Sequence, residues 1–169
     1  MGAPGMTEPQ RLFLVQARSD FNIFDMFKKQ ESIPRCHALY HLQIATELLG
    51  KAYAWRNGPT KLTHRAFVKF LKSLSSNPKA REQLGYQGQN ESWTHLLRKS
   101  KPLAEQIEDL APALAGDNPN PEYPWPPDAP TGTPVEFEFP IWTQLAETAH
   151  GRQFLKLITD LFSVAELYL

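Results

Sequence analysis

The apolar side chains of this chain recur mostly at three- and four-residue intervals, which is the period of an α-helix. Strand-like alternation is confined to a short stretch at Val135, Phe137 and Phe139. The chain is therefore predicted to be all-α, an up-and-down bundle of four to five helices. The expected helices cover 10–30, 35–56, a segment from a Thr63 N-cap through 67–74, 91–114 and 140–169.

The segment 35–56 is expected to be the central element of this bundle. Asn57, Gly58 and Pro59 then provide a stop signal. A helix of this length spans roughly 33 Å, which is enough to cross a small domain. Two later helices carry possible breaks, at Pro102 and Gly151. The apolar residues of the central segment follow one another in alternating steps of four and three, at Ala38, Leu42, Ala45, Leu49 and Ala52.

A proline-rich loop over 117–140 separates the last predicted helix from the others and contains eight prolines. Its aromatic side chains predict partial order, as a strap against the bundle. Tyr123 and Trp125 are its candidate partner-binding residues. A strand at 135–139 would have to pair at an oligomer interface. We expect one domain over 1–169, with a flexible N-terminal segment over 1–9.

Composition narrows the classes of protein without defining one. The 169 residues carry a formal net charge of zero and one cysteine, Cys36, so no internal disulfide forms. Neither a secretory signal nor a run of eighteen apolar residues is present, which predicts a cytoplasmic chain with no membrane contact. Charge is nevertheless uneven. Residues 51–101 carry eleven Lys or Arg and two acids, whereas 102–147 carry nine acids and no Lys or Arg. Either the acidic segment covers the basic one, or a basic face is open to phosphates.

The central segment also carries a family-like pattern. Its run Gln43-Ile-Ala45-Thr-Glu47-Leu-Leu-Gly-Lys51-Ala52 resembles the Gln-x-Ala-x-Glu-x-x-x-Lys-Ala signature on the second helix of HEPN (higher eukaryotes and prokaryotes nucleotide-binding) domains. Thr63-His64 and Tyr123-Pro124 match further steps of that pattern. The spacing of Glu47 and Lys51 is also that of an ordinary stabilising helix pair.

This resemblance implies a homodimeric helical bundle from a prokaryotic defence, toxin–antitoxin or RNA-processing system. Many HEPN proteins are metal-independent ribonucleases with an Arg, four to six residues, and a His late in the fold. Here Arg152 and Lys156 of the last helix have no His after them, His150 precedes Arg152, and Glu122 replaces the frequent Arg before Tyr123. We therefore expect the usual ribonuclease motif to be missing.

An Arg and a His at that spacing do occur elsewhere, at Arg35 and His41. A His can move the proton of a 2′-hydroxyl and an Arg can neutralise a phosphate, so the two are candidate catalytic residues. On a regular helix they point about 120° apart, so they would share a cleft only from a frayed first turn or across a dimer. His37 and His41 have metal-ligand spacing, but two His alone make no site, and we predict neither metal nor cofactor.

Cationic side chains on the third predicted helix are candidate nucleic-acid or phosphate ligands, at Lys61, Arg65, Lys69 and Lys72. They are equally consistent with a solvated helix face. The sequence thus favours a HEPN-like module that interacts with RNA, a nucleotide or a cognate partner protein. Two alternatives stay open: an endoribonuclease using Arg35 and His41 across a dimer, and a noncatalytic oligomer that binds a partner protein through the strap.

Overall fold

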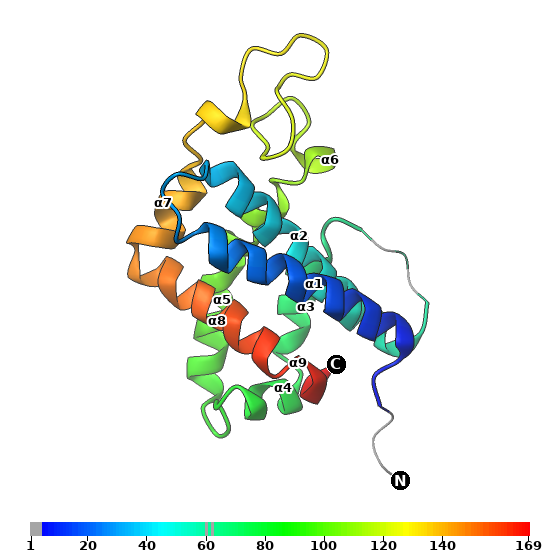
Figure 1. Cartoon of the computed structure of the whole chain (residues 1–169). Helices are drawn as coiled ribbons and strands as arrows, with labels where there is room; N and C mark the ends of the chain where they lie inside the picture. Colours follow the sequence, from blue (N-terminus) through cyan, green and yellow to red (C-terminus); the bar gives the residue numbers. More distant parts are fainter. Residues whose placement is uncertain (1–4, 60, 62) are drawn as a thin grey trace.

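The computed structural model describes residues 5–59, 61 and 63–169, and this part of the chain is a helical bundle, as predicted (Figure 1). No helix within these ranges is both long enough and apolar enough to cross a membrane. The helices are α1 (Glu8–Phe27), α2 (Arg35–Ala54), α3 (Ala66–Leu74), α4 (Pro78–Gln83), α5 (Asn90–Glu108), α6 (Pro112–Ala115), α7 (Pro140–Glu147), α8 (Ala149–Ser163) and α9 (Ala165–Tyr168), with 3-10 turns η1 (Trp55–Asn57) and η2 (Pro134–Glu136).

Helices α1 and α2 lie side by side and antiparallel along the bundle (Figure 1). Helix α1 begins at Glu8, inside the segment 1–9 that we expected to be flexible. The physical reason is a capping box, in which the Thr7 side chain accepts from the Gln10 backbone N–H and the Gln10 side chain accepts from the Thr7 N–H. Residues 1–4 lie outside the described part of the chain.

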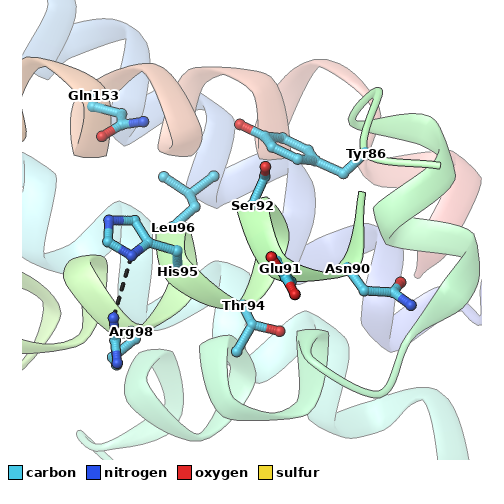
Figure 2. A pocket seen from close by; sticks show the side chains of 9 residues that line it. All are labelled: Tyr86, Asn90, Glu91, Ser92, Thr94, His95, Leu96, Arg98 and Gln153. Atoms are coloured by element: carbon cyan, nitrogen blue, oxygen red, sulfur yellow. Dashed lines mark hydrogen bonds between the residues drawn. The ribbon is translucent and has the colours of Figure 1, made fainter. Parts of the chain in front are cut away.

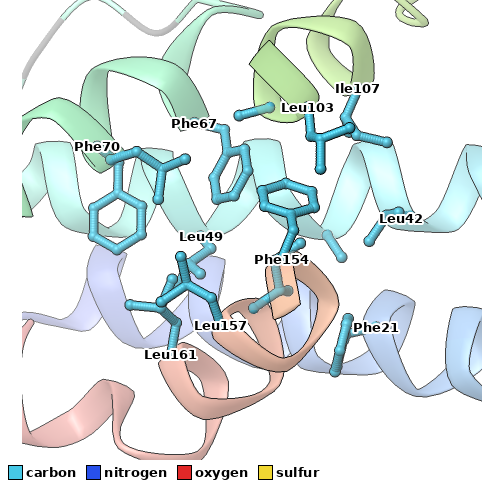
Figure 3. Packing of buried hydrophobic residues seen from close by; sticks show 14 of the residues in the cluster. Phe21, Leu42, Leu49, Phe67, Phe70, Leu103, Ile107, Phe154, Leu157 and Leu161 are labelled. Atoms are coloured by element: carbon cyan, nitrogen blue, oxygen red, sulfur yellow. The ribbon is translucent and has the colours of Figure 1, made fainter. Parts of the chain in front are cut away.

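Helix α2 is the central element, as predicted, because it packs against α1, α3 and α5. Its Leu42 and Leu49 are fully buried. Figure 3 shows how α3 and α8 meet over α2, with Phe67 facing Phe154. The ring centroids of Phe67 and Phe154 are 6.4 Å apart. One hydrophobic cluster thus joins the long helices.

Helix α3 begins later than predicted, and Thr63 is not its N-cap. The N-cap is Arg65, whose side chain makes no capping hydrogen bond. Instead, the buried carboxylate of Glu108 on α5 accepts from the Val68 N–H at 2.8 Å. Burial raises the pKa of Glu108. The start of α3 is therefore set by a residue forty positions away in sequence.

The last predicted helix is divided into α7, α8 and α9. Thr148 begins α8 by accepting from the Gly151 N–H at 2.8 Å. A Cβ on Gly151 would lie 1.9 Å from the Gln144 carbonyl oxygen, so only glycine permits this approach of α8 to α7. In contrast, α5 runs unbroken through Pro102. Helix α4, which we did not predict, begins where Asn77 accepts from the Ala80 N–H.

The 117–140 segment lies on one end of the bundle (Figure 1). Trp125 is buried and pairs with Gly132 through an isolated antiparallel bridge. Its ring lies edge-on to that of Phe137, with centroids 5.4 Å apart. The strand suggested for 135–139 is not formed in this chain, because residues 134–136 adopt a 3-10 turn instead.

Candidate functional site

A polar cluster forms around the carboxylate of Glu47 on α2, in the stretch that resembles the HEPN signature. Gln43, Glu47 and Lys51 are spaced four residues apart and so lie on one face of the helix. Gln43 Nε2 donates to Glu47 Oε2 at 2.8 Å, and Lys51 Nζ donates to Oε1 at 2.5 Å. The fourth member is His64, whose Nδ1 lies 2.9 Å from Oε2. An ionised carboxylate only accepts hydrogen bonds, so His64 Nδ1 is the donor.

The ionised form of Glu47 is favoured despite its burial at 8% exposure. Burial acts to raise the pKa of this carboxyl, but hydrogen bonds from Lys51 and His64 and the charge of Lys51 outweigh it, and the pKa lies below its ordinary value. Glu47 therefore holds Lys51 and His64 in fixed positions. The remaining signature residues, Ala45 and Ala52, are fully buried and pack rather than bind.

Lys51 also lines a pocket of about 210 Å³ between α2 and α3. Lys61, from the loop before α3, and Lys69, from α3 itself, line the same pocket. None of the described residues that line it carries a carboxylate. We call it the lysine pocket; its lining residues are Gly50, Lys51, Tyr53, Ala54, Lys61, Thr63, Ala66, Lys69, Phe70 and Ser73.

Gly50 permits the close contact on which this pocket depends. A Cβ at this position would lie 2.5 Å from the backbone carbonyl of Ala66 and 2.8 Å from the Phe67 nitrogen. Any side chain here would therefore push the start of α3 away from α2. The absence of a side chain at Gly50 lets His64 and Lys69 approach the Glu47 face of α2.

The four predicted cationic ligands separate into two groups. Lys61 and Lys69 line the lysine pocket, whereas Lys72 is exposed and does not. Arg65 is engaged elsewhere, because its guanidinium donates to Asp109 at 3.2 Å and lies 3.8 Å from Glu108. The third lysine of the pocket is Lys51, which the sequence had indicated as part of the family-like signature and not as a phosphate ligand.

The acidic segment 102–147 engages part of the basic segment 51–101. Among the described residues, the ion pairs between segments 51–101 and 102–147 are those of Arg65 with Glu108 and Asp109 and of Lys101 with Glu105. Lys61 and Lys69 make no ion pair with any residue that the structure describes. Of the two interpretations of the charge pattern, the open basic face agrees better with these contacts.

The structure places Arg35 and His41 in different surroundings within one chain. The Arg35 guanidinium stacks over the Trp142 ring at 4.7 Å from its centroid. His41 Nδ1 lies 2.9 Å from Asp20 Oδ1, and Gln16 donates to the other oxygen of this carboxylate at 2.8 Å. Sequence reasoning missed Asp20, although Gln16 and Asp20 share the four-residue spacing of Gln43 and Glu47.

Tyr123 and Trp125, the two candidate partner-binding residues of the strap, differ in their exposure to solvent. Trp125 is 9% exposed and packs inside the strap, whereas Tyr123 is 60% exposed. Only Tyr123 thus presents its ring to a partner. Within the described ranges, no group of three or more His, Cys, Asp or Glu side chains is arranged to hold a metal ion.

A larger and shallower hollow lies between the first turns of α5 and helix α8 (Figure 2). Its volume is about 780 Å³, and its walls mix Glu91, His95 and Arg98 with uncharged polar side chains. Arg98 and His95 hydrogen-bond each other at 3.2 Å. Since Glu91 and Arg98 carry opposite charges, whereas the lysines of the smaller pocket carry charges of one sign, the lysine pocket is the better candidate site for an anion.

Comparisons with protein-family models, with curated proteins and with solved structures found no match to this chain. The resemblance to HEPN domains therefore depends on the signature residues themselves.

Proposed function

We propose that this chain is a HEPN-like helical module that binds phosphate groups of RNA or of a nucleotide in the lysine pocket. In this proposal it acts as a noncatalytic subunit of a prokaryotic defence or toxin–antitoxin system, as the family resemblance suggests. The observation that carries the proposal is the convergence of Lys51, Lys61 and Lys69 on one pocket whose described lining contains no carboxylate.

The electrostatics of the pocket support an anionic ligand. Lysine side chains from three segments of the chain line one small volume, and only Lys51 among them is paired with a carboxylate of the described residues, that of Glu47, so the local charge is positive. Lysine is a common phosphate ligand because its ammonium group is a compact charge with three donors. The chain is neutral as a whole, so such binding depends on this local field rather than on long-range attraction.

The test is binding of the purified protein to labelled single-stranded RNA at two salt concentrations. A double variant, Lys61→Ala with Lys69→Ala, removes two pocket lysines and should weaken binding. For single strands, each phosphate that the protein no longer neutralises reduces the steepness of log K against log salt by about 0.7, so a double variant that loses one phosphate from the pocket should show a reduction of roughly 0.7.

A matched control removes the same charge outside the pocket. Lys79→Ala with Lys99→Ala changes two exposed lysines that do not line it. This control should bind RNA almost as the unmodified chain does. Equal losses in the two double variants would contradict the proposal and point to a general basic surface.

A second candidate function is favoured by the Asp20–His41 pair. With Nδ1 of His41 hydrogen-bonded to Asp20, Nε2 remains for proton transfer, which is the arrangement a general base needs. We had proposed Arg35 and His41 as an endoribonuclease site across a dimer, and Asp20 would orient His41 in it. RNA cleavage that is lost in both His41→Ala and Arg35→Ala, with folding retained, would support this function over the noncatalytic one.

A further inference from the structure

The shape of the lysine pocket restricts what can enter it. Pockets that enclose whole small-molecule ligands usually measure about 300–1,000 Å³. At about 210 Å³, the lysine pocket is smaller than this range. It therefore has room for a phosphate group, while a nucleoside attached to that phosphate would remain outside.

The aromatic side chains of the pocket are not available for base stacking. One contact of the Tyr53 ring is with Arg56, whose guanidinium carbon lies 3.7 Å from the ring centroid. Another is with Phe70, at 4.9 Å between centroids. Both Tyr53 and Phe70 are buried, at 5% and 2% exposure. Sites that bind single strands along their length stack bases on exposed aromatic rings. The lysine pocket offers none.

The charge of the pocket suits a dianion better than a monoanion. Lys51, Lys61 and Lys69 contribute three positive charges, and the Glu47 carboxylate bonded to Lys51 removes one. The local charge that remains is two positive. A terminal phosphomonoester carries about −1.5 to −2 at pH 7. Each internal phosphodiester of a nucleic acid carries a single negative charge.

We propose that the ligand of the lysine pocket is a terminal phosphomonoester, such as the 5′-phosphate end of an RNA strand or the phosphate of a nucleoside monophosphate, rather than an internal phosphodiester. This inference rests on the proposed function, since it names the chemical class that the same pocket selects. Lys61 and Lys69 contact the additional charge of the terminal phosphate, and Lys51, fixed by Glu47, lies at the wall of the pocket nearest α2.

The experiment compares two single-stranded RNA 12-mers of one sequence, each labelled at the 3′ end, one with a 5′-phosphate and one with a 5′-hydroxyl. We expect the phosphorylated strand to bind at least about tenfold more tightly, because one more charge-assisted contact is made. Lys69→Ala should abolish this preference, and Lys79→Ala, at an exposed lysine outside the pocket, should preserve it. Circular dichroism of each variant verifies that the helices are retained.

Competition identifies the source of the phosphate. Displacement of the labelled strand by adenosine monophosphate, but not by adenosine, supports a nucleotide ligand. Displacement by phosphorylated RNA alone supports an RNA end. Equal affinity of the two strands, with Lys69→Ala weakening both, would overturn this inference and leave the proposed function standing. Absence of binding by either strand and by adenosine monophosphate would overturn both.

Discussion

Two carboxylate–histidine pairs of the same design lie on either side of α2, and their surroundings differ. In each pair a buried acid lies one turn after a Gln that donates to it at 2.8 Å, and the acid is 2.9 Å from the Nδ1 of a His. Toward α1 the acid is Asp20, and its partner His41 packs edge-on against two rings, those of Phe27 and Tyr40.

Toward α3, the acid is Glu47, and it has an additional partner. Lys51 donates to the oxygen of Glu47 that His64 does not use, and Lys51 also lines a pocket with two further lysines. The comparison shows that the same hydrogen-bonding unit can close an interface between helices or can hold a charged side chain at a binding surface. What distinguishes the two uses is whether a cation and a cavity adjoin the carboxylate.

The largest expected effect comes from Glu47→Gln. The side chain of Lys51 is only 16% exposed, so loss of its counter-charge leaves a largely buried ammonium unpaired. We expect the free energy of unfolding to fall by about 3 kcal/mol. Urea denaturation measures this loss.

The matched variant on the α1 side of α2 is Asp20→Asn. No Lys or Arg pairs with Asp20 among the described residues, and the amide can still accept from His41. A loss of about 1 kcal/mol, with RNA affinity unchanged, is expected. Comparable losses from both variants would mean that the charge of Lys51 does not distinguish the two pairs.

A smaller difference in the free energy of unfolding is expected between alanine variants of the two histidines. His41→Ala removes a ring packed between Phe27 and Tyr40 and leaves the buried Asp20 with one partner fewer, which should cost about 2 kcal/mol. His64→Ala should cost less than about 1 kcal/mol, because the His64 side chain is 49% exposed. Thermal or urea unfolding of both variants decides the order, and a larger loss from His64→Ala would contradict it.

The last prediction concerns how the stability of the fold depends on pH. Because the pKa of Glu47 lies below its ordinary value of 4.5, its ionised form stabilises the folded state, and this contribution is lost as pH falls through the folded pKa. The pKa shift of Glu108 has the opposite sign, because burial raises its pKa. Its protonated form therefore stabilises the folded state at low pH, and this contribution declines as pH rises through the folded pKa.

The difference in urea midpoint between the unmodified chain and Glu47→Gln isolates the first effect. It should be constant near neutral pH and narrow between about pH 5 and 3, where the carboxyl becomes protonated. A difference that stays the same down to pH 3 would show that the charge of Glu47 does not contribute.

The sequence by itself determined what depends on spacing along one helix. The period of Leu42, Ala45 and Leu49 identified α2 as the central helix, and the four-residue steps of Gln43, Glu47 and Lys51 placed these side chains on one face. The aromatic residues of the 117–140 segment likewise predicted a partly ordered strap. Such features follow from the 3.6-residue turn and from the need to bury apolar area, both of which are local in sequence.

Tertiary structure alone decided which segments meet. The loop before α3 brings His64 to Glu47, and α1 brings Asp20 to His41. Glu108 of α5 accepts from the first turn of α3, whose N-cap is Arg65 instead of the expected Thr63. The same packing pairs Arg65 with Asp109, so it does not line the pocket with Lys69, with which it had been grouped by spacing. These contacts join residues 17 to 44 positions apart. Periodicity cannot predict them, because the geometry of a helix fixes which residues share its face but not which other segment packs against that face.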